Sequence, residues 1–170
     1  MALFTSLKLE TMNDLFLAEI KDLYDAEHQI VKALPQMREA AHSSELKQAF
    51  STHQAQTEQH VQRLEQVFRM VGQDPERETC QAMKGLISEG NEMISAKGDP
   101  DVKDAALIAA AQRVEHYEMS GYGSARTFAH RIGRSDVAQI LDQTLDEEKQ
   151  TDKLLSQIAE SSVNIRAQRT

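Results

Sequence analysis

The sequence contains no tryptophan, a single cysteine, three prolines and only 5% aromatic residues. Runs of Val, Ile and Thr that would form strands are also missing, whereas the helix formers Ala, Leu, Gln, Glu and Lys are abundant. These absences argue against a sheet, so we expect an all-α protein. The lone Cys80 cannot form a disulfide within the chain, which is typical of a reducing compartment such as the cytosol.

Long apolar runs and an excess of positive charge are absent as well. No apolar run approaches the ~18 residues that cross a membrane, and the first ten residues are too mixed for a signal peptide. The formal net charge is −8, from 19 Lys and Arg against 27 Asp and Glu, so no basic field attracts phosphates. We therefore expect a cytoplasmic protein that has neither nucleic acid nor a membrane as a partner.

Apolar residues that recur every three or four positions predict four long helices in a single domain. Gly72 and Gly133 are natural helix ends, and Ser43 or Ser44 is a suitable cap for the second helix. The predicted helices span about residues 11–41, 45–71, 101–132 and 135–160.

The lengths of the connections predict the topology. The short breaks at 42–44 and 133–135 make two antiparallel helical hairpins. The connection at 73–100 is long enough to cross the bundle and carries a short extra helix at 80–97. Two hairpins joined by one crossover form a ferritin-like four-helix bundle. The predicted parts are a mobile N-terminal arm at 1–10, the bundle at 11–162 and a frayed tail at 163–170.

Each of the four helical stripes is apolar at both ends and polar in the middle. Reflection of each hairpin about its turn places these polar bands at one level of the bundle. The polar positions are Glu27 in the first helix, His53, Thr57 and His60 in the second, Glu115 and Glu118 in the third, and Glu148 and Thr151 in the fourth, with Gln56 and Asp152 beside them.

Four buried glutamates in one layer require neutralisation. Each carboxylate costs several kcal/mol to desolvate, and mutual repulsion adds to that cost. No Lys or Arg lies in the central seam of the stripes. Two divalent cations would balance the charge, and glutamate with histidine suits iron, manganese or zinc better than magnesium. The coincidence of four polar bands therefore predicts a site for two metals.

Each polar residue also has an interpretation without metal. A single glutamate on a helix seam is usually solvated, and a lone histidine is usually hydrogen-bonded. Thr57 and Thr151 can bond to the carbonyl of the preceding turn, and the three tyrosines can simply pack. The alternative hypothesis is therefore a structural or interaction bundle whose polar core binds no metal.

Four segments resemble a known family. The sequence is similar to the YciE/YciF family of bacterial stress-associated, ferritin-like proteins, and closest to its YciF branch. The resemblance implies a rubrerythrin-like four-helix bundle with a dinuclear metal centre, usually in a homodimer. The matching segments are DLYDAEHQIVKALPQM (22–37), HQAQTEQHVQRLEQVF (53–68), DAALIAAAQRVEHYEMSGYG (104–123) and LDQTLDEEKQTDKLLSQIA (141–159).

The resemblance also implies a ligand set. The ferritin-like pattern has Glu-x-x-His on the second and fourth helices. Here these positions read Thr57-x-x-His60 and Glu148-x-x-Thr151, so Gln56, His53 and Asp152 are the expected substitutes. Tyr24 and Tyr117 are candidate hydrogen-bond donors to the ligands. The predicted metal ligands are Glu27, His53, His60, Glu115, Glu118, Glu148 and Asp152.

Together these observations predict a ferritin-like, dinuclear metal-binding protein of the bacterial stress response. Iron is the first candidate, with manganese or zinc as alternatives. The expected roles are peroxide or oxygen reduction, or metal sequestration, in a cytoplasmic homodimer.

Overall fold

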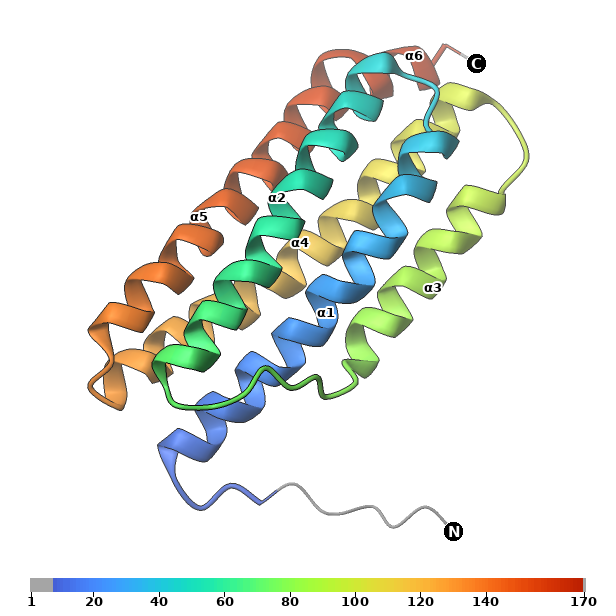
Figure 1. Cartoon of the computed structure of the whole chain (residues 1–170). Helices are drawn as coiled ribbons and strands as arrows, with labels where there is room; N and C mark the ends of the chain where they lie inside the picture. The colour runs from blue at the N-terminus through green and yellow to red at the C-terminus, as the bar shows by residue number, and fades with distance from the viewer. Residues whose placement is uncertain (1–7, 170) are drawn as a thin grey trace, which may run out of the picture.

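The computed structural model describes residues 8–169. Within this range all regular secondary structure is helical (Figure 1). Residues 1–7 of the predicted N-terminal arm lie outside the described residues. The elements are α1 (Met12–Ala40), α2 (Ser44–Met70), α3 (Gln81–Ser95), α4 (Pro100–Arg131), α5 (Ser135–Ile158), the π-helical turn η1 (Ala159–Val163) and α6 (Asn164–Ala167).

Helices α1, α2, α4 and α5 form a four-helix bundle of two antiparallel hairpins, α1–α2 and α4–α5. Figure 1 shows α3 running along the outside of this bundle, where it packs on α1 and α4. The crossover through α3 returns the chain to the opposite end, so α4 runs in the same direction as α2. The predicted all-α bundle with a crossover helix is confirmed.

Local hydrogen bonds explain why the long helices begin and end where they do. Thr11 and Asp14 form a reciprocal capping box at the start of α1. Gly72 and Gly133 follow α2 and α4 with φ of 71° and 78°, a left-handed conformation that glycine adopts without strain. In both turns the backbone bonds are those of a Schellman motif, for example from Gln73 N to Phe68 O at 2.9 Å.

The turn between α1 and α2 is organised by a residue from another helix. Ser43 is the N-cap residue of α2, but the carboxylate that accepts from this turn belongs to Asp104 of α4. Its two oxygens each lie 2.7 Å from a backbone nitrogen, one of His42 and one of Ser43. The buried Asp104 therefore ties the first hairpin to α4.

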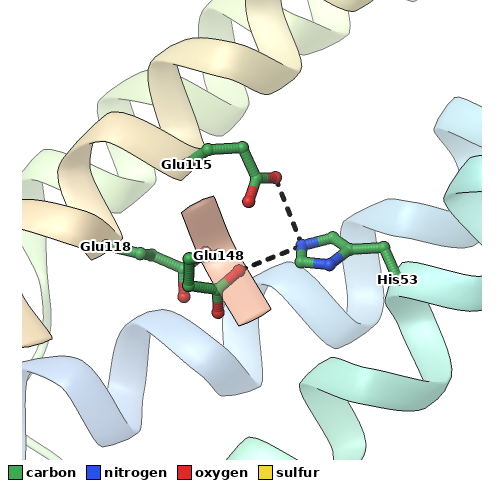
Figure 2. A group of neighbouring side chains, drawn as sticks. All are labelled: His53, Glu115, Glu118 and Glu148. Carbon is green, nitrogen blue, oxygen red and sulfur yellow. Dashed lines mark ion pairs between the residues drawn. The ribbon is translucent and has the colours of Figure 1, made fainter. Parts of the chain in front are cut away.

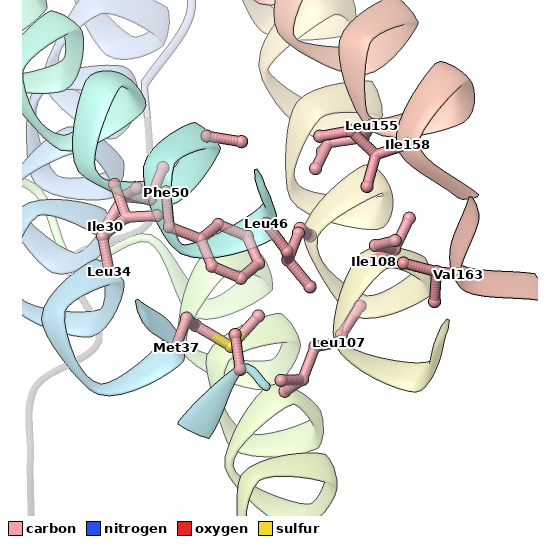
Figure 3. Close-up of a cluster of buried hydrophobic side chains, with 14 of the residues drawn as sticks. Ile30, Leu34, Met37, Leu46, Phe50, Leu107, Ile108, Leu155, Ile158 and Val163 are labelled. Atoms are coloured by element: carbon pink, nitrogen blue, oxygen red, sulfur yellow. The ribbon is translucent and has the colours of Figure 1, made fainter. Parts of the chain in front are cut away.

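Two apolar clusters fill the two ends of the bundle. The upper cluster, drawn in Figure 3, includes Ile30, Phe50, Ile108 and Leu155. The lower cluster includes Phe16, Leu64, Tyr122 and Leu141, among others. Between the clusters lies the layer of glutamates and histidines, which is thereby shielded from solvent at both ends.

Gly121 allows α4 to approach α1 closely. A Cβ atom at this position would lie 2.7 Å from Leu23 Cδ2, closer than side chains can pack. A Cβ atom at Gly123, two residues further on, would meet nothing within 4 Å. The requirement for glycine is therefore specific to position 121.

The tail at 163–170 is predicted from the sequence to be frayed, whereas in its described part, residues 163–169, α5 continues through η1 into α6. Residue 170 lies outside the described residues. The wider π turn brings Val163 to the same face as Ile158, and both side chains are buried in the upper cluster. Arg166 Nε also lies 2.8 Å from Asp101 Oδ1. A single valine after a change of helical period leaves no periodic signal in the sequence.

Candidate metal centre

Six of the seven predicted ligands meet in one buried layer. Helix α1 provides Glu27, α2 provides His53 and His60, α4 provides Glu115 and Glu118, and α5 provides Glu148. Each of these residues is at most 3% exposed. The hairpin geometry inferred from the sequence therefore does bring the four polar bands together.

The layer divides into two groups that share one carboxylate. His53, Glu115, Glu118 and Glu148 form the first group, and Figure 2 shows these side chains converging from three helices. Glu27, His60 and Glu148 form the second group. Within each group, one nitrogen or oxygen atom per residue lies within 4.8 Å of the others, which is close enough to surround a single cation.

Glu148 connects the two groups through its two oxygens. Its Oε1 lies 2.8 Å from His60 Nδ1, whereas its Oε2 lies 3.9 Å from His53 Nε2. His53 Nε2 also lies 3.2 Å from Glu115 Oε1, and His60 Nδ1 lies 3.4 Å from Glu27 Oε1. The carboxylate of Glu148 thus faces one histidine on each side.

The outer nitrogen of His60 is held by Glu147. His60 Nε2 lies 2.8 Å from Glu147 Oε2, and since a carboxylate only accepts, Nε2 carries the proton. Arg63 holds the same carboxylate through two hydrogen bonds of 2.6 and 2.8 Å. In neutral His60 the lone pair therefore belongs to Nδ1, which faces the carboxylate layer.

The outer nitrogen of His53 is held in a similar way by Thr151. The Thr151 hydroxyl donates to the Glu147 backbone carbonyl at 3.2 Å, so its oxygen accepts from His53 Nδ1 at 3.3 Å. In neutral His53 the lone pair is then on Nε2, toward Glu115 and Glu148. Both histidines have the arrangement typical of metal ligands, in which an outer hydrogen bond sets the tautomer.

The inner atoms of the layer lack hydrogen bonds. Within residues 8–169, eight buried side-chain atoms have no partner in hydrogen-bond geometry, and all eight belong to the six ligand candidates. Buried polar atoms without partners are costly and rare in native proteins. They are His53 Nε2, His60 Nδ1, Glu27 Oε2, Glu115 Oε2, and both carboxylate oxygens of Glu118 and Glu148. The donor set therefore fits a pair of cations bound inside the layer.

The charges of the layer shift the histidine pKa values upward. Burial disfavours the His53 imidazolium, but the charge of Glu115 outweighs burial and raises the pKa of His53 to about 9. Burial also opposes a charge on His60, yet the carboxylates of Glu148 and Glu27 raise the pKa of His60 to about 11. Without metal, both imidazoles are therefore cationic at neutral pH and partly balance the glutamates.

The pKa values of two glutamates are raised as well, which favours their neutral form. Burial raises the pKa of Glu115 to about 7, against the opposing effect of His53. Burial and the charges of Glu148 and Glu27 raise the pKa of Glu118 well above its usual value. The metal-free layer thus retains protons that bound cations would displace.

Asp152 is the predicted ligand that the structure does not bring into either group. Its Oδ1 accepts from Gln112 Nε2 at 3.0 Å and lies 3.3 Å from His116 Nε2. On the helical face of α5, Asp152 lies one position beyond Thr151, so its carboxylate points toward α4 at the edge of the layer. Of the expected substitutes His53 and Asp152, the structure therefore brings only His53 into a ligand group.

The tyrosine predictions are also corrected. Tyr24 donates to Glu65 at 3.1 Å, and Tyr117 donates to Asp22 with Cys80 Sγ 3.0 Å away. The tyrosine that reaches a ligand candidate is Tyr122, whose buried hydroxyl donates to Glu27 Oε1. In the sequence, Tyr122 occupies a position of the apolar stripe of α4 and is therefore interpreted as a packing residue. The stripe does not show which group its hydroxyl contacts.

The sequence analysis did not predict that Glu147 and Arg63 belong to the surroundings of the site. Glu147 stands in the charged run DEEK, which is typical of a solvated helix face, and Arg63 is one of several polar residues on α2. The signal that could have identified them is spacing, because Arg63 follows His60 by three residues on the same face.

The fold and the buried layer define a class of four-helix bundle whose core holds ligand-type side chains from all four helices. Residues 11–168 match the family described as a domain of unknown function, DUF892, and the chain belongs to this family. It is 40% identical to Protein YciF of Escherichia coli (strain K12) over 163 residues, which cover 95% of this chain and 98% of YciF.

Solved structures agree with this membership. The E. coli stress protein YciF superposes with a TM-score of 0.88 at 41% identity and covers 92% of this chain and 99% of its own. YcfI from Rhodopseudomonas palustris gives 0.86 at 41% identity, with 90% and 98% covered. A protein from Xanthomonas campestris pv. campestris shares the fold at 18% identity, with a TM-score of 0.75 and 94% and 98% covered.

None of the helices within residues 8–169 is long and apolar enough to cross a membrane.

Proposed function

We propose that this chain binds two divalent transition metals in its buried layer, with iron as the first candidate and manganese or zinc as alternatives. The observation that carries the proposal is the position of Glu148, which directs one oxygen to each histidine and belongs to both ligand groups. A shared carboxylate between two ligand groups is the arrangement of dinuclear centres in ferritin-like bundles.

The ligands divide between the two metals. His53, Glu115 and Glu118 would hold the first metal, and Glu27 and His60 the second, with Glu148 between them. Imidazole and carboxylate together suit iron, manganese and zinc. In the described part of the chain, the cationic side chains within 4.0 Å of these carboxylates are His53 and His60, so bound metals would replace protons as the main source of positive charge.

We propose a stress-related role, because the E. coli relative is a stress protein. When bound, a pair of redox-active metals supplies electrons for the reduction of peroxide or dioxygen, and its binding alone can sequester metal. The chain itself orients the two imidazoles through Glu147 and Thr151, and Tyr122 donates a hydrogen bond to Glu27. The apolar clusters at both ends exclude bulk water from the layer.

Elemental analysis of protein purified without chelator tests the proposal. We expect about two metals per chain in the wild type, as in other dinuclear bundles. Glu148→Ala should lose both metals, whereas Glu27→Ala and Glu115→Ala should each lose one. Asp146→Ala, an exposed change on the same helix as Glu148, should keep both.

The second candidate is a structural or interaction bundle with a metal-free polar core. It is favoured by the elevated pKa values of His53 and His60, because two imidazolium ions can balance part of the carboxylate charge. This candidate predicts much less than one metal per chain and an unchanged melting temperature after iron is added. Metal-dependent stabilisation would argue against it.

The cellular setting is part of the same proposal. We propose a cytoplasmic homodimer, based on the single cysteine and the family resemblance. Light scattering coupled to size-exclusion chromatography measures the mass directly. A monomer at micromolar concentration would contradict the dimer without affecting the metal site.

A further inference from the structure

A small pocket lies between α1, α3 and α4 and ends at the candidate metal centre. Its volume is about 40 Å³. Most of its wall is aliphatic and includes Ile30, Leu86, Ile87 and Ile94. The polar residues of the lining are Asn91 of α3 and two ligand candidates, His53 and Glu115, which are its ionisable residues.

The crossover helix α3 forms the outer wall of this pocket. Gly90 of α3 lines the pocket and is buried, while Asn91 next to it is exposed. The pocket therefore leads from the outer surface of α3 toward the ligand layer, through a part of the chain that lies outside the four bundle helices.

The volume restricts the occupant to a very small molecule. A water molecule needs roughly 10–15 Å³ of such space, and a cavity that binds benzene has about 150 Å³. At about 40 Å³, the pocket has room for a molecule with two heavy atoms but not for an aromatic ring or a long chain.

The lining restricts the polarity of the occupant. Water and hydrogen peroxide lose hydrogen bonds when they enter an aliphatic pocket, and each lost bond costs at least ~1 kcal/mol. Dioxygen makes almost no hydrogen bonds in water and pays no such penalty. Size and lining together therefore favour a diatomic, apolar gas.

We propose that this pocket binds dioxygen and holds it beside His53 and Glu115. The use of that dioxygen at a metal rests on the proposed function, whereas the pocket itself is formed by apolar residues and needs no metal. The inference also selects dioxygen from the two oxidants that the proposed function leaves open.

Two glycines of α3 provide a matched pair of variants. A Cβ atom at Gly90 or at Gly85 would meet nothing within 4 Å, so both positions accept a side chain without a backbone clash. Gly90 lines the pocket, whereas Gly85 is exposed and lies outside its lining. Gly90→Leu should fill the pocket, and Gly85→Leu should leave it open at a similar gain in helix propensity.

Xenon binding to the full-length, metal-free protein tests the pocket without any reaction. The ¹²⁹Xe NMR shift should show saturable binding in the wild type and in Gly85→Leu, with loss of binding in Gly90→Leu. Gly90→Ala, which adds one methyl group, should retain weaker binding and shows whether the effect follows side-chain size. Absence of xenon binding in the wild type, or its persistence in Gly90→Leu, would overturn the proposal.

Ferrous iron oxidation separates the oxidants. With iron-loaded protein, Gly90→Leu should slow oxidation by dioxygen relative to Gly85→Leu, while oxidation by hydrogen peroxide should be little changed. Equal slowing with both oxidants would contradict the selection of dioxygen, and no slowing would contradict delivery through this pocket. A chain that binds xenon but no iron would contradict the proposed function and its use of dioxygen, and would leave the pocket as an apolar binding site.

Discussion

His60 Nε2 lies 2.8 Å from Glu147 Oε2, so a residue at the edge of the bundle holds the outer nitrogen of a buried imidazole. The backbone carbonyl of Glu147 also accepts from Thr151, whose oxygen in turn contacts His53 Nδ1. One residue of α5 therefore orients both histidines, through its side chain for one and through its backbone for the other.

Removal of the Glu147 side chain should weaken metal binding although Glu147 belongs to neither ligand group. Glu147→Ala leaves His60 free to rotate or to change tautomer, and loss of such an outer partner typically costs about 10–100-fold in metal affinity. Titration with ferrous or zinc ions, monitored by competition with a chelating dye, measures the change. Asp146→Ala is the control, since Asp146 is exposed and bonds to Lys149. Equal affinities for the two variants would show that Glu147 does not orient the site.

Glu118 should destabilise the metal-free protein. Among the described residues, neither of its carboxylate oxygens has a hydrogen-bond partner, and the side chain is completely buried. Burial and the neighbouring carboxylates raise the pKa of Glu118 well above its usual value, so folding must either bury its charge or protonate it, and both cost free energy. Replacement of a buried ionisable group by an apolar residue of similar volume is often stabilising by about 1–4 kcal/mol. Glu118→Met should therefore raise the free energy of unfolding in the presence of chelator.

Bound metal should favour the wild type over Glu118→Met. The wild type should gain about 2.7 kcal/mol at a free metal concentration of 100 times Kd, whereas Glu118→Met should gain less. Guanidinium unfolding with and without metal provides both numbers. The exposed Glu58→Met is the matched control, and it should show neither effect. If Glu118→Met without metal is much less stable than the wild type, the Glu118 carboxyl group stabilises the metal-free protein and the prediction is wrong.

The sequence predicted the layer because the evidence for the layer is periodic. Each helix carries its polar residues at intervals of three and four, and short hairpins fix their heights relative to one another. This periodicity predicts from the sequence alone that Glu27, Glu115 and Glu148 lie in one layer. Their role as metal ligands stays a prediction.

The periodicity of the sequence does not predict contacts between helices that are not joined by a short turn. Asp104 bonds to the turn at His42 across 62 residues, and Glu147 bonds to His60 across 87 residues. Both acidic residues stand among other charged residues in positions typical of a solvated helix face. Only the crossing of the helices, which depends on packing, determines that their carboxylates meet partners.

The stability of the metal-free protein should fall as pH rises from neutral to alkaline. The folded-state pKa values of His53 and His60, about 9 and 11, lie above the unfolded value of 6.5. Their contribution is complete below pH 6.5 and is lost as pH rises through 9 and then 11. The pKa of Glu115 is raised from 4.5 to about 7, so the protein also loses stability through this group as pH rises from 4.5 to 7.

Unfolding by guanidinium in chelator, measured between pH 6 and pH 11, checks the expected slope. His53→Gln should reduce the slope between pH 6.5 and 9 and leave the slope between pH 9 and 11, which is due to His60, in place. A wild-type curve that stays flat up to pH 10 would show that the imidazoles are not held cationic by the glutamates.

Asp104 should stabilise the first hairpin through its two bonds to the α1–α2 turn. Asp104→Asn turns one acceptor oxygen into an amide donor that faces a backbone N–H, and a buried donor without an acceptor costs about 1–3 kcal/mol. Asp101→Asn on the same helix is the control. Asp101 forms a partly exposed ion pair with Arg166, which should be worth less than ~1 kcal/mol. Similar losses for the two variants would contradict the special role of Asp104.

Gly121 and Gly123 should respond differently to the same substitution. Gly123→Ala should stabilise the protein by up to ~1 kcal/mol, because alanine is the better helix former and its Cβ meets free space. Gly121→Ala gains the same propensity but places a methyl group against Leu23 Cδ2, which costs about 1–3 kcal/mol in a well-packed core. The two free energies of unfolding should therefore differ in favour of Gly123→Ala.

Leu23→Val tests whether that single contact is responsible. In the wild type this change shortens a buried side chain and should destabilise the protein. Together with Gly121→Ala, it should cost less than it does alone, because the shorter side chain makes room for the new methyl group. A double-mutant cycle with guanidinium unfolding measures this coupling, which should be at least ~0.5 kcal/mol for residues in direct contact. If the effects of the two substitutions on the free energy of unfolding simply add, the contact with Leu23 is not what limits the approach of α4 to α1, and the backbone is.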